Sequence, residues 1–282
     1  MQRPADLTDR PMLDRYRRRA RSAARPAMFL QQEAASELSE RLNLVNRRFT
    51  APAIVTPFPE VWQGVLPGAK LVADAEVLDL RPGAHDLVIH AMALHWANDP
   101  VGQLIQARRA LKPDGLFLGA LFGGQTLHQL RAALAEAEVA RSGGLSPRVA
   151  PMAEIRDLGG LLQRAGFALP VADSLMRTVT YPTPLDLMRD LRAMGEANAM
   201  AARSRRFTAR RLLDDAARRY VAGFAQPDGR IPASFEIICL TGWAPDETQP
   251  KPLRPGSATA RLADALGAEE TPLNDPTLTP KI

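Results

Sequence analysis

The stretch DLVIHAMALHWANDPVGQLIQARRALKPDGLFLGAL, residues 86–121, decides the fold class. It opens with a short apolar run, residues 86–91, and closes with another, residues 116–121; such runs are typical of buried strands in a parallel sheet. Between them, apolar residues recur at helical spacing over residues 100–111, and residues 112–115 have the composition of a tight turn. Strand, helix, turn and strand in this order predict a right-handed crossover unit and hence an α/β fold.

The same alternation continues on both sides of this unit. Short apolar runs predict further strands at residues 53–55, 70–73, 171–181 and 234–243. Helical spacing predicts helices at residues 126–140 and 154–165, and a helical insert at residues 184–224 before the last strand. The sequence therefore predicts a mostly parallel sheet that is covered by helices.

The N-terminal part reads as helical over residues 10–46, and residues 10–25 form the densest basic stretch of the chain. An arginine-rich, acid-poor start is also typical of a mitochondrial transit peptide. The amphipathic pattern continues beyond that stretch, so we interpret it as part of the mature protein. The alternative role for this helix is contact with an acidic partner or with a membrane surface.

We predict three parts along the chain. Residues 1–48 form an N-terminal helical segment packed on the core, and residues 49–245 form the α/β domain that contains the helical insert. Residues 246–282 are rich in proline and lack periodicity, which indicates an extended or disordered tail.

Composition excludes several classes of protein. With 282 residues, 46% of them hydrophobic and 24% charged, the chain is typical of a globular protein. The net charge of +5 comes from arginines that alternate with acidic residues, which favours solvated faces over nucleic-acid binding. One cysteine, Cys239, and four histidines exclude a disulfide framework and argue against a metal centre. No apolar run reaches the roughly 18 residues of a membrane span, so we expect a cytoplasmic protein.

Several motifs resemble one superfamily. Residues 86–115 are similar to the region of the fourth and fifth strands of class I S-adenosylmethionine-dependent methyltransferases. Further stretches follow in order: Phe122-Gly123-Gly124-Gln125-Thr126-Leu127, Gly143-Gly144-Leu145-Ser146-Pro147, residues 157–167, Met194-Gly195-Glu196-Ala197-Asn198, Gly242-Trp243 and Gly256-Ser257-Ala258-Thr259. Together they resemble the mitochondrial complex I assembly factor 5 family in its bacterial branch, over about residues 12–260.

The resemblance implies a Rossmann-like methyltransferase fold and a protein partner. The best-known member of the family hydroxylates an arginine of a complex I subunit during assembly. The resemblance therefore implies a complex I subunit or assembly factor as partner, and peripheral contact with the inner membrane. Relatives in the wider superfamily methylate small molecules or acyl carriers.

The motifs that hold the cofactor in that superfamily depart from the expected pattern. Residues 56–62, TPFPEVW, stand where a glycine-rich turn would let the backbone approach S-adenosylmethionine, and proline removes backbone donors there. Only 30 residues separate Val55 from Asp86, so the second strand, with its ribose-binding carboxylate, is expected to be deleted or shortened. Asp74 matches the acidic residue that would contact adenine; a surface turn is its alternative role. We therefore expect a degraded cofactor site, and we predict no metal.

Other candidate site residues follow the fourth and fifth strands. His95 is a candidate general base, and a packing residue beside Trp96 is its alternative role. Gly123 and Gly124 are candidates for giving a ligand backbone access, or else form a sharp strand-to-helix turn. Gln125 and Gln129 stand where relatives usually carry Asp and Glu, so two candidate carboxylates are neutral amides.

Three functional hypotheses remain open. The first is an enzyme that hydroxylates or methylates a side chain of a partner in complex I assembly. The second is a non-catalytic assembly scaffold, a pseudoenzyme. The third is a methyltransferase that acts on a small molecule or an acyl carrier.

Overall fold

The computed structural model describes residues 6–250 and Gly267. The chain divides into two units, Met1–Asp246 and Glu247–Ile282. The predicted tail, residues 246–282, and the 256–259 motif lie almost wholly outside the described residues. The predicted division at residues 48 and 245 stays a proposal.

The first unit contains a sheet of six strands in the order β2-β1-β3-β4-β6-β5. The strands are β1 (Pro52–Val55), β2 (Lys70–Val72), β3 (His85–Ala91), β4 (Leu111–Phe122), β5 (Ala168–Tyr181) and β6 (Ile231–Trp243). The strands β1 to β4 run parallel to one another, whereas β6 runs antiparallel to both of its neighbours, β4 and β5. The prediction of a mostly parallel α/β sheet is thus confirmed.

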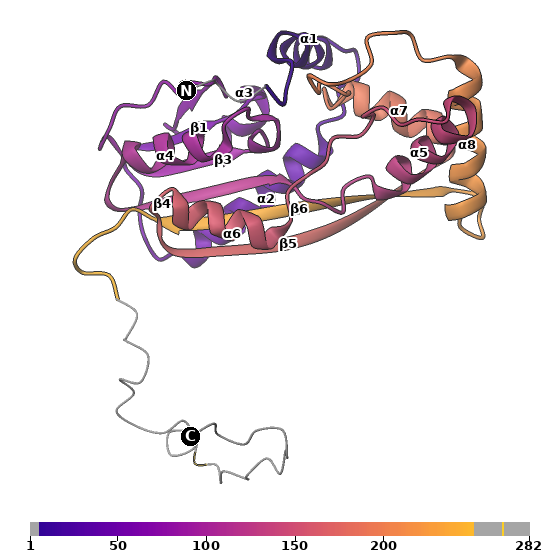
Figure 1. Ribbon diagram of the computed structural model, residues 1–282. Coiled ribbons are helices and arrows are strands. Elements are labelled where there is room, and N and C mark those ends of the chain that lie inside the picture. Colours follow the sequence, from indigo (N-terminus) through magenta and orange to yellow (C-terminus); the bar gives the residue numbers. More distant parts are fainter. Residues whose placement is uncertain (1–5, 251–266, 268–282) are drawn as a thin grey trace, which may run out of the picture. The chain divides into compact units, whose positions relative to one another are not determined.

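Helices cover both faces of the sheet (Figure 1). They are α1 (Arg10–Arg21), α2 (Phe29–Leu44), α3 (Pro59–Trp62), α4 (Pro100–Ala110), α5 (His128–Ser142), α6 (Ile155–Arg164), α7 (Pro184–Ala193) and α8 (Arg210–Phe224), with a short 3₁₀ turn η1 (Leu94–Trp96). Successive strand residues alternate between the two faces. Thus Val88 packs with α4 and α6, whereas Leu87 and Ile89 pack with α2, α5, α7 and α8.

The predicted helical stretches contain breaks. Residues 22–28 separate α1 from α2, and Pro26 in this segment cannot continue a helical hydrogen-bond ladder. Residues 194–209 separate α7 from α8 within the insert. The loop between α7 and α8 is part of the site described below, because its residues 195–203 contact α1 and the edge of the sheet.

A second difference concerns residues 112–115, which we predicted to form a turn between helix and strand. They belong to β4 but interrupt its regular pairing with β3. His85 pairs with Leu111, whereas Leu87, only two residues further along β3, pairs with Leu116, five residues further along β4. Asp114 has a φ of 55°, which is compatible with a local bulge of the strand.

A single strand lies between β1 and β3 along the chain. It is β2, with three residues, and it pairs directly with β1 from Ala53↔Lys70 to Val55↔Val72. The four-residue helix α3 is the helix of the β1–β2 connection. This short connection agrees with the small number of residues that the sequence provides here. No helix within the described residues is long and apolar enough to cross a membrane.

Candidate functional site

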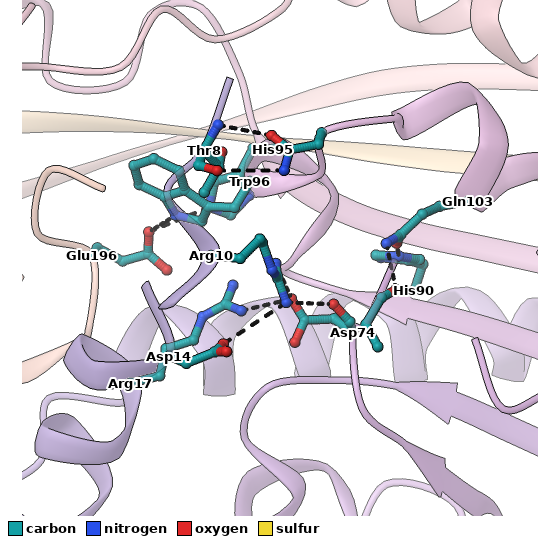
Figure 2. Close-up of polar contacts among 12 residues, drawn as sticks. Thr8, Arg10, Asp14, Arg17, Asp74, His90, His95, Trp96, Gln103 and Glu196 are labelled. Carbon is teal, nitrogen blue, oxygen red and sulfur yellow. Dashed lines mark hydrogen bonds and ion pairs between the residues drawn. The ribbon is translucent and has the colours of Figure 1, made fainter. Parts of the chain in front are cut away.

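The parallel strands end at one edge of the sheet, where open α/β folds bind their ligands. Thr56 follows β1, Asp74 follows β2, η1 follows β3 and Gly123 follows β4. Helix α1 also reaches this edge, because two of its arginines contact Asp74 (Figure 2). The site therefore combines the sheet edge with the N-terminal helix.

Asp74 is buried and held by two guanidinium groups. Arg17 Nη1 lies 2.6 Å from Asp74 Oδ2, and Arg10 Nη1 lies 3.2 Å from the same oxygen. Arg10 Nη2 also donates to the Asp74 backbone carbonyl at 2.7 Å. Burial favours a raised pKa for Asp74, but Arg17 and Arg10 together hold that pKa below its usual range. The carboxylate is therefore ionised and joins α1 to the edge strand.

These contacts correct part of the expectation that the basic residues 10–25 contact an acidic partner or a membrane surface. Leu13, Arg17 and Ala20 follow one another at helical spacing and are all buried, so Arg17 lies on the internal face of α1. Arg10 and Arg17 thus face inward, whereas Arg18 and Arg21 remain exposed. Only the outer arginines are available as a partner surface.

The expected cofactor position is a small cavity between α1 and the ends of β1 and β2. It has a volume of about 260 Å³ and is lined by three arginines, Arg17, Arg18 and Arg21, and by two carboxylates, Asp14 and Asp74. Pro57 and Pro59 line it as well and have no backbone N–H to offer. The volume is below the roughly 300 Å³ at which pockets for drug-sized ligands begin. The role of Asp74 towards adenine stays a prediction; the contacts present are with arginines.

The aromatic residues of the β1 loop are core residues. Phe58 is fully buried against Ala20 and Met28. Trp62 is fully buried in the main core and donates from Nε1 to Gln31 Oε1 at 3.0 Å. The loop that holds the cofactor in the superfamily is thus used here to pack α1 and α2.

His95 is part of a buried polar contact rather than an open base. Its Nε2 lies 3.3 Å from Glu196 Oε2, which also accepts a 2.6 Å hydrogen bond from Trp96 Nε1 (Figure 2). The side chains of His95 and Glu196 are 2% and 8% exposed. Glu196 Oε1, also buried, has no hydrogen-bond partner among the described residues. His95 is brought to Glu196, and its catalytic role stays a prediction.

Glu196 lines a second cavity, larger than the one beside α1, with a volume of about 430 Å³. The walls come from α5, α7, α8 and the loops beside them and are mainly apolar. They include Trp96, Phe122, Leu127, Leu130, Leu134, Val149, Met152, Met188, Leu191, Leu213 and Phe235. Burial favours a raised pKa for Glu196, but nearby His95 and Arg17 and the Trp96 hydrogen bond hold that pKa below its usual range. The cavity thus combines the ionised carboxylate of Glu196 with apolar walls and with three arginines, Arg148, Arg192 and Arg203.

The two glycines after β4 are explained by close approaches of side chains. A Cβ on Gly123 would lie 2.5 Å from Glu236 Oε2, and a Cβ on Gly124 would lie 2.3 Å from Glu154 Oε1. Gln129, nearby on α5, exchanges hydrogen bonds with Ser234 at 2.7 and 3.2 Å. Neither glycine lies at the 260 Å³ cavity or the 430 Å³ cavity, and their cofactor role stays a prediction.

Glu138 fixes one wall of the larger cavity. It accepts hydrogen bonds from Ser146 N at 2.9 Å, from Ser146 Oγ at 2.6 Å and from Arg148 Nη2 at 2.7 Å. The Arg148 and Ser146 hydrogen bonds lower the pKa of Glu138 from 4.5 to about 2. The wall is therefore held most firmly above about pH 4.5, and this contribution is lost as the pH falls towards 2.

Changing Glu138 to glutamine is expected to loosen the loop of residues 143–150. Each lost charge-assisted hydrogen bond is worth about 1.5–3 kcal/mol, so the loop amides should exchange with deuterium roughly ten to a hundred times faster. Glu136→Gln is the matched control, because that side chain is on the same helix and 62% exposed. Unchanged protection of the loop in Glu138→Gln would contradict this role.

Sequence reasoning missed Glu196 and Arg17 as site residues. Glu196 stands in the 194–198 motif, directly after Gly195 with its φ of 80°. The sequence signal for Glu196 was its place directly after a glycine, because glycine is favoured where the backbone adopts a positive φ. The signal for Arg17 was its place on the apolar stripe of an amphipathic helix. Among the described residues, no group of three or more His, Cys, Asp or Glu could hold a metal ion.

Comparison with known proteins finds a matching domain family and several similar proteins. A family model for a methyltransferase domain matches residues 12–119. Arginine-hydroxylase NDUFAF5, mitochondrial, of Danio rerio is 40% identical over 199 residues, 71% of this chain and 62% of that protein. A malonyl-[acyl-carrier protein] O-methyltransferase of Halorhodospira halophila is 36% identical over 171 residues, 61% of this chain and 56% of that protein. Among solved structures, the YcgJ protein of Bacillus subtilis aligns over 76% of this chain and 99% of its own, with a TM-score of 0.46 and 12% identity.

The chain spans less than two thirds of the length of these two curated relatives. The region that matches the family model includes β1, β2, β3 and β4 up to residue 119, and therefore most of the sheet edge described above. Residues 12–119 match the methyltransferase-domain family, and the chain is similar to arginine-hydroxylase NDUFAF5 of Danio rerio.

Proposed function

We propose that this protein binds an arginine side chain of a protein partner in the 430 Å³ cavity and holds it against Glu196. The observation that carries the proposal is Glu196 Oε1, a buried carboxylate oxygen without a hydrogen-bond partner among the described residues, in a residue that lines that cavity. Leaving a buried charged acceptor unpaired is unfavourable, so a ligand that donates to it gains free energy.

The carboxylate and the apolar walls favour a guanidinium group on an apolar stem. Of the three arginines that also line the cavity, Arg148 and Arg203 are already paired with Glu138 and Asp9. A guanidinium pairs with a carboxylate through charge-assisted hydrogen bonds, and its aliphatic stem packs on apolar walls. Leu130, Met188 and Leu213 provide such walls. The NDUFAF5 relatives are named arginine-hydroxylases, which supports arginine as the side chain that is bound.

The surroundings of the cavity favour a protein as the bearer of that side chain. Phe207 is fully exposed and Leu145 is 68% exposed. Each stands next in sequence to a residue that lines the cavity, Thr208 and Ser146 respectively. Exposed apolar side chains beside a pocket are typical of protein-binding surfaces. By the family resemblance the partner is a complex I subunit or assembly factor, and we expect it to co-purify with the protein from a cell lysate.

We further propose that this binding does not depend on S-adenosylmethionine. The position expected for the cofactor is lined by arginines of α1 and by two prolines. Holding the partner as an assembly chaperone requires only the cavity and its rim. Titration with millimolar S-adenosylmethionine or S-adenosylhomocysteine is expected to give no heat, and measurable binding would contradict this part of the proposal.

The Glu196→Gln variant tests the proposal. A synthetic peptide with one arginine among apolar residues is expected to bind the wild type, and its citrulline counterpart at least tenfold more weakly. In Glu196→Gln the arginine peptide should lose about 1.5–3 kcal/mol of binding free energy, roughly a ten- to hundredfold rise in Kd. Calorimetry measures these constants, and circular dichroism checks that the variant is folded.

Glu40→Gln is the matched control, because Glu40 is an exposed glutamate away from the cavity lining. An unchanged Kd for the arginine peptide in Glu196→Gln would overturn the proposal. A malonyl thioester that binds the wild type, and binds Glu196→Gln more tightly, would instead favour the acyl-carrier function named by the Halorhodospira relative.

A further inference from the structure

The smaller cavity, about 260 Å³ between α1 and the ends of β1 and β2, has an unusual charge. Arg17, Arg18 and Arg21 line it together with Asp14. These positions follow helical spacing, so they form one face of α1 directed towards the sheet edge. The face is separate from the 430 Å³ cavity of Glu196.

Positive charge exceeds negative charge in this cavity. Asp74 Oδ2 is shared by Arg10 and Arg17, and Asp14 lies 3.9 Å from Arg10. Within the described part of the chain, Arg18 and Arg21 form no ion pair. Three guanidinium groups and two carboxylates line the cavity, an excess of one positive charge, and Arg10 pairs with both carboxylates from outside the lining, which raises the local excess to two.

Hydrogen-bond donors at the cavity also lack partners. Arg17 is 2% exposed, and its Nε and Nη2 have no hydrogen-bond partner among the described residues. Thr56, buried at the end of β1, lines the cavity, and its Oγ1 accepts from Phe58 N at 3.1 Å. The Thr56 hydroxyl can therefore donate its own hydrogen to a ligand.

We propose that this cavity is a binding site for a phosphate group. A phosphate carries up to two negative charges and several acceptor oxygens, which match the excess charge and the Arg17 and Thr56 donors. The planar guanidinium is well suited to phosphate oxygens. Asp14 and the second oxygen of Asp74 oppose an anion, but Arg10 lies beside both carboxylates and offsets much of that repulsion.

The phosphate can come from a free anion or from a lipid headgroup at a membrane surface. Arg15 and Arg19 are exposed on the same helix but do not line the cavity. They provide a matched control for general charge attraction. If the cavity binds phosphate specifically, the affinity for phosphate should depend much more on Arg18 and Arg21 than on Arg15 and Arg19.

The test measures the Kd of inorganic phosphate by calorimetry at constant ionic strength. The double variant Arg18→Gln/Arg21→Gln is expected to weaken phosphate at least tenfold, and Arg15→Gln/Arg19→Gln to change it less than twofold. All four side chains are exposed, so neither double variant should unfold. Equal losses in the two double variants, or no phosphate binding by the wild type, would overturn a site for free phosphate.

Co-sedimentation with vesicles distinguishes the lipid source. Vesicles of phosphatidylcholine alone are compared with vesicles that also contain phosphatidic acid. Retention on phosphatidic acid that is lost in Arg18→Gln/Arg21→Gln and kept in Arg15→Gln/Arg19→Gln supports a headgroup, even if free phosphate does not bind. No specific retention together with no phosphate binding overturns the proposal entirely. Binding of the arginine peptide should be unchanged in Arg18→Gln/Arg21→Gln, because neither side chain lines the 430 Å³ cavity, so failure here is distinguishable from failure of the arginine-binding proposal.

Discussion

Replacing Arg17 with methionine is expected to cost about 3–5 kcal/mol of unfolding free energy, because it leaves the buried carboxylate of Asp74 without its shorter ion pair. Arg10 remains at 3.2 Å from the same oxygen, so we expect the lower part of this range. Urea unfolding at pH 7, with the slope of the transition compared between variants, measures the loss.

A double-mutant cycle provides the control for that result. Asp74→Asn removes the charge that Arg17 faces, so Arg17→Met should cost less in that background than in the wild type. The pKa of Asp74 is lowered from its usual 3.8, so the ion pair stabilises the fold above about pH 4 and is lost as the pH falls below it. The cost of Arg17→Met should therefore shrink in acid. Equal stability of Arg17→Met and wild type at pH 7 would show that the contact contributes nothing.

Replacing Trp62 with alanine is expected to cost about 3–5 kcal/mol, the range typical of large aromatic-to-alanine changes in a core. Trp62 is fully buried among residues of α2 and the sheet, so its loss leaves a cavity beneath the β1 loop. Thermal and urea unfolding both report the change. A loss below about 1 kcal/mol would mean that this loop is not part of the packed core.

Trp62→Phe separates packing from hydrogen bonding. Phenylalanine keeps most of the apolar volume but leaves the buried Gln31 Oε1 without the indole donor, a loss of about 1–3 kcal/mol. We therefore expect Trp62→Phe to lie between the wild type and Trp62→Ala. Similar losses in both variants would assign the effect to the hydrogen bond alone.

The strands and most helices could be predicted because their signals are local. The apolar runs of β3 and β4 are buried on both faces, as the sequence pattern of a parallel sheet requires. The short β1–β2 connection also followed from counting residues between Val55 and Asp86. Residues 112–115 were expected to form a turn, yet they continue as a bulge of β4, because strand pairing to β3 resumes beyond them.

The site could be predicted only in part because its contacts are distant in sequence. Arg17 and Asp74 are 57 positions apart, and Trp96 and Glu196 are 100 apart. Asp74 and His95 were identified by their places after strands. Their partners Arg17 and Glu196 were not, because a buried ion pair depends on how α1 and the loop after α7 dock on the edge. Local periodicity indicates which face of a helix is internal but does not specify the contact.

The attachment of α1 has a consequence for the order of folding during synthesis. Asp9 N donates to Ala199 O at 2.8 Å, Thr8 bridges Met200, and Arg203 pairs with Asp9 at 2.8 Å. On the ribosome, α1 emerges long before residues 199–203, so these anchors do not exist while the sheet strands β1 to β4 are being made. Such sequence-distant contacts are slow to close. Until those residues are made, α1 is attached to the sheet edge through Asp74 and Phe58 and lacks this second set of contacts.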